Sequence, residues 1–262
     1  DGMRGPAGQF PLDAATIEVV GRSLTRQFRE KLGRVPRFVS GRDTRESGSW
    51  IELAFHKGAC AEGAECLSAD VITTPGVAFL TKRFQFDAGI VISASHNPFH
   101  DNGIKIFAPT GKKIDSETER AIEADIFLKT DSSKNEAGPT APDNSRSGEF
   151  QIAYLEYLSE EFCDLKLENF KLVIDCANGA ASSLAPPLFE KFGAEVVAIN
   201  CSPDGVNINE DCGSLHLERV QAKVIEEKAN FGVAFDGDAD RSLFVDEKGN
   251  LVDGDAVLWI MA

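Results

Sequence analysis

The chain has 262 residues, of which 42% are hydrophobic and 26% are charged, a composition typical of globular proteins. Its 42 acidic residues outnumber 27 lysines and arginines and give a formal net charge of −15. Such a surface repels nucleic acids and anionic membranes, so we expect neither as a partner. The length suits one large domain or two ordinary ones. No apolar run approaches the roughly 18 residues that are needed to cross a bilayer.

Predicted strands and helices alternate along the first half of the chain. Ile17, Val20, Leu24 and Phe28 recur at helical spacing and indicate a helix over residues 14–32. The same patterns predict helices at 47–58 and 77–82, a break at 74–76, and strands at 37–40, 65–72, 89–92 and 103–107. This order is typical of α/β units.

Residues 131–149 carry Pro, Gly, Ser and charge without periodicity and mark the expected domain boundary. Beyond them, the sequence predicts a helix at 151–162, a helix after the turn at 178–180 that runs to 192, and strands at 171–175, 195–199 and 231–235. We therefore expect two consecutive α/β domains, 1–145 and 150–262, each a mixed sheet flanked by helices.

The ends of the chain suggest that it is a fragment of a longer protein. Residues 1–5 lack an initiator methionine, and residues 255–262 have the pattern of the first turns of an apolar helix. The six cysteines show neither a CxxC pair nor a dense framework, so we expect buried thiols in a reducing compartment, the cytoplasm, and we do not expect a zinc site. These cysteines are Cys60, Cys66, Cys163, Cys176, Cys201 and Cys212.

The first candidate site lies between the strands predicted at 89–92 and 103–107. Its polar loop offers the Ser95 hydroxyl, the His96 imidazole and, just beyond, the Lys105 amine, which are a nucleophile and two helpers. Adjacent residues in a loop usually point apart, so His96 is not favoured as the direct base. No G-x-S-x-G elbow is present, which argues against an α/β-hydrolase. Turn formation before Pro98 explains the same polar residues equally well.

The second candidate site follows the strand predicted at 231–235. Asp236, Asp238 and Asp240 alternate within five residues, and carboxylates this close repel one another unless a cation joins them. All-oxygen ligands suit a hard cation such as Mg²⁺. The alternative is a solvated acidic turn. An EF-hand loop is excluded, because its sixth position needs glycine and holds Arg241, and because the flanks have the pattern of strands.

Several basic residues are candidates for binding an anion. Arg42 and Arg45 flank Asp43 after a strand, where they either form a local ion-pair network, which is favoured for Arg45, or line a phosphate pocket. Arg4 lies near two glycines in an expected flexible loop and is a better anion contact. Residues 207–214 suggest a structured loop without an assignable task.

Together these motifs resemble those of the α-D-phosphohexomutase superfamily. Ser-Ala-Ser-His-Asn-Pro at 93–98 is similar to its phosphoserine loop, and Asp-Gly-Asp-Ala-Asp-Arg at 236–241 to its magnesium loop, with Ala239 where glycine is more usual. The segments at 1–5, 41–45 and 74–76 match in order and spacing. The extended form of the serine loop, together with residues 207–214, is most similar to the bacterial phosphoglucosamine mutase subfamily.

The resemblance implies an isomerase that interconverts glucosamine 6-phosphate and glucosamine 1-phosphate. Ser95 would carry a phosphoryl group, and Asp236, Asp238 and Asp240 would hold Mg²⁺ that also touches this phosphate. A bisphosphorylated sugar would be the intermediate, and glucose or glucosamine 1,6-bisphosphate the activator. Lys105 would be the general acid/base.

The same resemblance assigns phosphate-supporting roles to Arg4, His96 and Arg241, and Arg42 is a further candidate. The superfamily normally has four domains, of which this chain would hold the first two, with the third and fourth absent. The sequence leaves open the oligomeric state and two other functions. These are a phosphomannomutase or phosphoglucomutase, and a non-catalytic homologue that binds a metal or a sugar phosphate.

Overall fold

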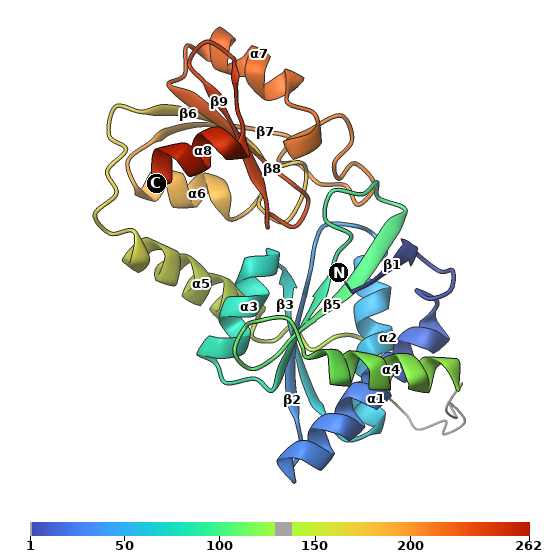
Figure 1. The fold of residues 1–262 in the computed structure, drawn as a ribbon. Helices are drawn as coiled ribbons and strands as arrows, with labels where there is room; N and C mark the ends of the chain where they lie inside the picture. Colours follow the sequence, from blue (N-terminus) through green and yellow to red (C-terminus); the bar gives the residue numbers. More distant parts are fainter. Residues whose placement is uncertain (1, 129–137) are drawn as a thin grey trace. The chain divides into compact units, whose positions relative to one another are not determined.

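The computed structural model describes residues 2–128 and 138–262 (Figure 1). Its packing divides the chain into two compact units: residues up to 94 with 100–151, and residues 95–99 with 152–262. Each unit is built on its own five-stranded mixed sheet with helices beside it, which confirms the predicted fold class. Part of the predicted boundary at 131–149 lies outside the described residues.

The sheet of the first unit has the order β1-β5-β4-β2-β3. Its strands are β1 (Met3–Pro6), β2 (Arg37–Arg42), β3 (Glu65–Val71), β4 (Ala88–Ile92) and β5 (Asp101–Phe107). β2 pairs in parallel with β3 and β4, whereas β5 is antiparallel to both β4 and β1. Every residue of β4 is buried, as expected for an apolar central strand that is covered on both faces.

The helices of the first unit are α1 (Ala14–Leu32), α2 (Gly48–Ala61), α3 (Thr74–Arg83) and α4 (Ser116–Phe127). α1, α2 and α4 lie on one face of the sheet and α3 on the other (Figure 1). α1 confirms the prediction for residues 14–32 and begins at Asp13, whose side chain accepts a hydrogen bond from the Thr16 amide at 3.0 Å. Its apolar stripe packs with α2 into one core that includes Ile17, Leu24 and Phe55.

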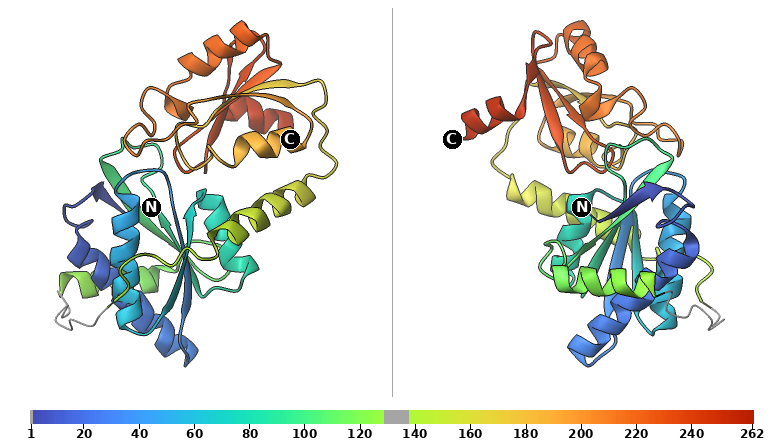
Figure 2. Two further views of the ribbon diagram at one scale, coloured as in Figure 1. Left: turned by 180° about the vertical axis from the view of Figure 1, so that it is seen from behind. Right: turned by 45° about the vertical axis from the view of Figure 1, so that its right-hand side comes forward.

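The second unit repeats the strand order as β10-β9-β8-β6-β7. Its strands are β6 (Lys171–Asp175), β7 (Glu195–Ile199), β8 (Phe231–Phe235), β9 (Ser242–Asp246) and β10 (Leu251–Val252). The strands β6, β7 and β8 confirm their predicted bounds. α6 (Ala185–Lys191) and α7 (Glu218–Glu227) pack on opposite faces of this sheet (Figure 2).

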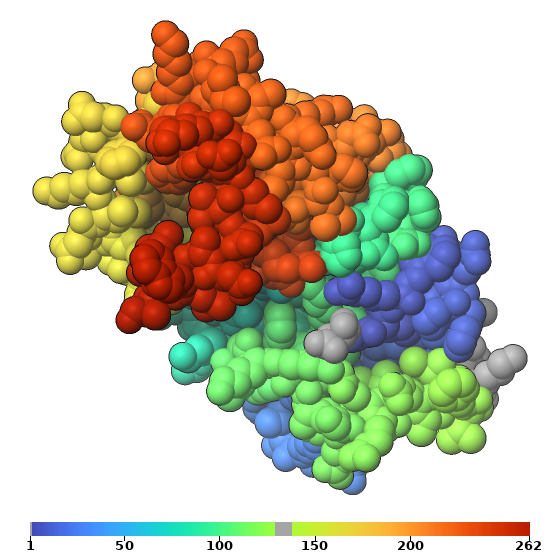
Figure 3. Space-filling view, turned by 45° about the horizontal axis from the view of Figure 1, so that its top comes forward, coloured from blue at the N-terminus to red at the C-terminus, as the bar shows by residue number. Residues whose placement is uncertain are grey.

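Three further elements complete the described chain. α5 (Ser147–Glu161) belongs to the first unit up to Gln151 and to the second from Ile152 onward. A short 3₁₀ helix, η1, spans Gly213–Leu215. The last helix, α8 (Gly254–Met261), has no buried residue, and its Trp259 side chain is 83% exposed, so the apolar end of the chain lies on the surface (Figure 3).

The structure corrects several of the predictions. Residues 74–76 form the first turn of α3 instead of a break, because Thr73 caps the Gly76 amide at 3.2 Å and proline is tolerated in a first helical turn. The helix predicted after 178–180 begins only at Ala185, since the residues before it form turns. Arg4 lies in β1 and not in a flexible loop. Among the described residues, no helix is long and apolar enough to span a membrane.

Candidate active site

Ser95 lies in the loop that follows β4, and this loop segment, residues 95–99, groups with the second unit. The backbone of Ser95 has a φ of 55°, in the left-handed region that residues other than glycine seldom adopt. Its side chain is fully buried, and its Oγ donates a hydrogen bond to Oδ2 of Asp236 at 2.5 Å. The strained turn therefore aims the hydroxyl at the first residue of the acidic loop.

Arg241 completes the surroundings of this hydroxyl. One of its terminal nitrogens, Nη2, donates to Ser95 Oγ and lies 3.2 Å from Asp236 Oδ2. The same nitrogen lies 2.6 Å from Nδ1 of His96. A guanidinium is only a donor, so Nδ1 must accept, which places the proton of a neutral His96 ring on Nε2. The serine hydroxyl thus contacts a carboxylate and a cation together.

The three aspartates converge as the sequence analysis expected. Asp236, Asp238 and Asp240 each offer a carboxylate oxygen within 4.8 Å of the other two. Asp236 and Asp238 are buried, whereas Asp240 is exposed. Burial, followed by the charge of Asp238, raises the pKa of Asp236 to about 6, although the hydrogen bond from Ser95 opposes this rise. The donor set is all oxygen and carries mutual repulsion, which a hard divalent cation relieves, so these residues fit Mg²⁺.

The turn within the acidic loop explains two of its small residues. Ala239 has a φ of 54° and donates its amide to the Asp236 carbonyl at 3.0 Å, so glycine would suit this position better. At Gly237, an added Cβ would lie 2.6 Å from the Ser95 carbonyl oxygen. The serine loop and the acidic loop therefore pack backbone against backbone, and only glycine permits this approach.

Asn209 is a site residue that the sequence analysis did not assign. Its Nδ2 donates to the carbonyl oxygens of Ser95 at 2.8 Å and of Asn97 at 3.1 Å. Its own amide donates to the Ala177 carbonyl at 2.9 Å, and its φ is 58°. Asparagine is one of the few side chains that tolerate this conformation, which is the signal that the pattern Asn-Ile-Asn at 207–209 offered.

Asp175, at the end of β6, is a second residue that the sequence analysis missed. Its buried carboxylate accepts hydrogen bonds from the Ala177 amide at 2.9 Å, the Asn200 side chain at 3.0 Å and the Gly213 amide at 3.1 Å. Burial raises its pKa despite these bonds. Asp175 thereby ties together the loops on either side of Asn209.

The two arginines beside Asp43 take part in ion pairs of the first unit. Arg42 lies 3.2 Å from the buried carboxylate of Glu52 and 2.5 Å from that of Asp70. Arg45 pairs with Asp43, and both side chains are fully buried. The network reading that was favoured for Arg45 holds, and the guanidinium of Arg42 is also engaged by carboxylates.

Arg4 and Lys105 lie on neighbouring strands of the first unit. Arg4 is opposite Gly103 in the β1–β5 pair, and Lys105 is opposite Val91 in the β4–β5 pair. Within the described residues, the buried Nε of Arg4 has no hydrogen-bond partner. Ser95, His96, Arg241 and the aspartates are thus brought together in the second unit, whereas Arg4, Arg42 and Lys105 belong to the first.

Two models of known protein domains match the sequence of this chain. Residues 1–133 match the model of phosphoglucomutase/phosphomannomutase alpha/beta/alpha domain I, and residues 153–249 match that of alpha/beta/alpha domain II. The chain belongs to the phosphoglucomutase/phosphomannomutase family.

Individual proteins of known name or structure are also similar to this chain. The phosphoglucosamine mutase of Solibacter usitatus is 46% identical over 98% of this chain and 57% of its own length. That of Citrifermentans bemidjiense is 45% identical over 100% of this chain and 58% of its own length. A phosphoglucomutase/phosphomannomutase family protein of Burkholderia thailandensis has a similar crystal structure, with a TM-score of 0.79 at 28% identity over 98% of this chain and 56% of that one. The chain therefore spans less than three fifths of the length of these relatives.

Proposed function

We propose that this chain supplies the phosphoryl-carrying serine and the metal site of a phosphoglucosamine mutase, which interconverts glucosamine 6-phosphate and glucosamine 1-phosphate. The observation that carries the proposal is the buried Ser95 hydroxyl, 2.5 Å from Asp236 and in contact with Arg241. The names of the two relatives at 45% and 46% identity support the choice of sugar. Residues 1–145 and 150–262 would be the first two domains of the whole protein.

The residues around Ser95 suit a hydroxyl that accepts and returns a phosphoryl group. The hydrogen bond to Asp236 fixes the direction of the hydroxyl proton, and Arg241 donates to the same oxygen, so these two contacts hold Oγ in place. The positive charge of Arg241, which already contacts Oγ, stabilises the dianionic phosphate once the ester has formed. Since phosphoryl transfer depends mainly on positioning and charge, this fixed geometry is the chief contribution of the loop.

Asp236, Asp238 and Asp240 would hold a magnesium ion, which when bound supplies positive charge to the phosphoryl oxygens. His96, whose Nδ1 lies 2.6 Å from Nη2 of Arg241, holds that guanidinium in place. Arg4 and Arg42 are proposed phosphate contacts, and Lys105 is the proposed proton carrier for the sugar hydroxyl. The bisphosphorylated sugar would be both the intermediate and the activator. The protein would work in the cytoplasm, a reducing compartment that suits its six free cysteines.

The test is transfer of a phosphoryl group to Ser95. The purified chain is incubated with glucose 1,6-bisphosphate and Mg²⁺, and its intact mass is measured. Wild type should gain about 80 Da, the mass of one phosphoryl group, and Ser95→Ala should gain nothing. Ser49→Ala, which changes an exposed serine, is the matched control and should behave as wild type. A wild-type chain that never gains the group, or a Ser95→Ala chain that gains it, would contradict the proposal.

The choice of sugar needs a second measurement. The phosphorylated chain is mixed with glucosamine, glucose or mannose monophosphate, and loss of the added mass is followed in time. The fastest loss should occur with glucosamine phosphate. Faster loss with glucose or mannose phosphate would favour the phosphoglucomutase or phosphomannomutase that the family description names. Because the relatives are longer than this chain, we expect the 262 residues alone to accept the group but to turn over slowly.

A further inference from the structure

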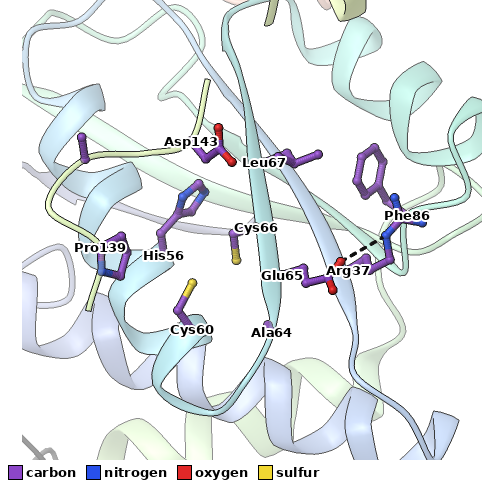
Figure 4. Close-up of a pocket in the computed structure, with 11 residues that line it drawn as sticks. Arg37, His56, Cys60, Ala64, Glu65, Cys66, Leu67, Phe86, Pro139 and Asp143 are labelled. Atoms are coloured by element: carbon purple, nitrogen blue, oxygen red, sulfur yellow. Dashed lines mark ion pairs between the residues drawn. The ribbon is translucent and has the colours of Figure 1, made fainter. Parts of the chain in front are cut away.

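Two cysteines face one pocket in the first unit, away from the candidate active site. Cys60 lies in the last turn of α2, and Cys66 is the second residue of β3. Both line a cavity of about 420 Å³, together with His56 and Asp143 among others. Figure 4 shows the two sulfur-bearing side chains and the His56 ring pointing into this space. Solvent can therefore reach a pair of thiols that belong to neighbouring elements.

The two thiols are not equivalent. Their sulfur-bearing side chains point toward one another within the pocket that both residues line (Figure 4). The neighbouring Cys66 thiol lowers the pKa of Cys60 to about 7, against the opposing effect of burial. The Cys60 sulfur, followed by burial, raises the pKa of Cys66 well above its usual range. A thiolate is the reactive form of cysteine, so Cys60 is the nucleophile of the pair and Cys66 the partner that stays protonated.

The remaining cysteines lack this arrangement. Burial raises the pKa of Cys176 far above its usual range and that of Cys212 to about 12, which makes both of them inert. Cys163 is exposed, and Cys201 is half-buried. Cys60 and Cys66 thus differ from the other cysteines in lining a pocket together and in having clearly different pKa values.

We propose that Cys60 and Cys66 form a reversible redox site, which hydrogen peroxide or a similar two-electron oxidant converts to an intramolecular disulfide. The backbone already brings the sulfurs together: the turn between α2 and β3 is closed by the Ala64 amide, which donates to the Ala59 carbonyl at 3.1 Å. An S–S bond of about 2.05 Å needs the two sulfurs to approach one another, and the pocket that both side chains enter leaves room for this movement. This inference stands independently of the proposed function.

The chemistry balances in two steps. The Cys60 thiol ionises, its thiolate attacks one peroxide oxygen, an S–O bond forms and the O–O bond breaks. The departing hydroxide takes up the proton that the thiol released and becomes the first water. The Cys66 thiol then loses its proton as its sulfur attacks the sulfenic sulfur of Cys60. The S–S bond forms, the S–O bond breaks, and water leaves. Two thiols are oxidised by two electrons and one peroxide is reduced to two waters. A dithiol reductant reverses the reaction.

A disulfide in this pocket would link α2 to β3, two elements that hold the sheet of the first unit together. α2 carries Glu52 and His56, whose side chains lie 2.5 Å and 2.8 Å from the Ser40 hydroxyl of β2. The segment that closes the pocket is held by the Ser68 amide of β3, which donates to the Asp143 carbonyl at 2.7 Å. A Cys60–Cys66 disulfide would pin the end of α2 to β3 between these two contacts.

The experiment treats the purified chain with a modest excess of hydrogen peroxide, alkylates the remaining thiols and maps the peptides by mass spectrometry. We expect one new linkage, between Cys60 and Cys66, with a mass loss of about 2 Da for two hydrogens. Dithiothreitol should restore both thiols. If Cys60 and Cys66 remain fully alkylatable at a peroxide dose that already oxidises the exposed Cys163, the inference is wrong.

Variants separate the two roles. In Cys66→Ser the sulfenic acid of Cys60 has no partner, so dimedone should label Cys60, whereas in Cys60→Ser it should not label Cys66. Cys163→Ser is the matched control and should form the disulfide as wild type does. Labelling of Cys66 but not Cys60 would overturn the assignment of roles. The wild-type peptide map needs no substitution, so it decides the main point even if a variant folds poorly.

Discussion

The sheets of the two units are built alike, and their equivalent loops carry different chemistry. β4 and β5 in the first unit correspond to β8 and β9 in the second, because each pair is antiparallel and occupies the same place in its strand order. The loop after β4 contains Ser95 and the loop after β8 contains the three aspartates. Each turns through one residue other than glycine in the left-handed region, Ser95 at 55° and Ala239 at 54°.

The difference between these loops shows which features set the chemistry. The acidic loop is short, holds its own turn by hydrogen bonds and places three carboxylates within 4.8 Å. The serine loop is held from outside itself, by Asn209 and by the close approach of Gly237. Equivalent loops of the two sheets can therefore carry either a cluster of carboxylates or a buried hydroxyl, and the sequence of each loop determines which one it carries.

Removing charge from the acidic loop should have the largest effect. In the double variant Asp238→Asn/Asp240→Asn, two of three anionic ligands become neutral, and we expect affinity for Mg²⁺ to fall by about a thousandfold, or about 4 kcal/mol. Titration calorimetry measures this. Glu247→Gln, an exposed change in the following loop, is the control and should bind as wild type. Equal affinity of the double variant would show that this loop is a solvated turn and not a metal site.

Acid should change the stability contributions of two buried groups, His56 in the first unit and Asp175 in the second, in opposite senses. Burial lowers the pKa of His56 in the first unit to about 4, so between pH 6.5 and 4 the unfolded chain binds a proton that the folded chain does not. The contribution of neutral His56 to the free energy of unfolding is therefore complete above pH 6.5. It decreases as the pH falls, by up to about 3 kcal/mol. Burial raises the pKa of Asp175 in the second unit, so that group favours folding at acid pH and loses its contribution as the pH rises.

Urea unfolding can be followed for the first unit alone through Trp50, in a Trp259→Phe background that removes the other tryptophan. The free energy of unfolding should decline from pH 6.5 to pH 4, and His56→Gln should flatten that decline. An unchanged decline in His56→Gln would assign it to other groups.

The smallest expected effect comes from loosening the serine loop. Asn209→Gly keeps the backbone conformation but removes two hydrogen bonds to the loop, each worth about 1 kcal/mol. We expect phosphoryl acceptance by Ser95 to slow by about tenfold, or about 1.4 kcal/mol, with faster amide exchange confined to residues 95–99. Asn169→Gly, which changes another asparagine with positive φ, is the matched control. Wild-type exchange and rate in Asn209→Gly would mean that the loop holds itself.

The sequence by itself determined the α/β class, the helix at 14–32 and the strands β6, β7 and β8, because periodicity and apolar runs between turns are local signals. It also marked Ser95 and the aspartates, since their spacing is chemically unusual. Only the tertiary structure brought Ser95 to Asp236, 141 residues away, and gave Asn209 and Asp175 their partners.

Tertiary structure also determined the partners of residues whose type alone does not indicate a role. The sequence did not reveal that Arg42 pairs with Glu52 and Asp70. Cys60 was one of six unremarkable thiols until the fold placed Cys66 of β3 in the same pocket. Such partners are chosen by strand order and loop packing. A local pattern cannot carry that information, because it depends on which distant segments the sheet places side by side.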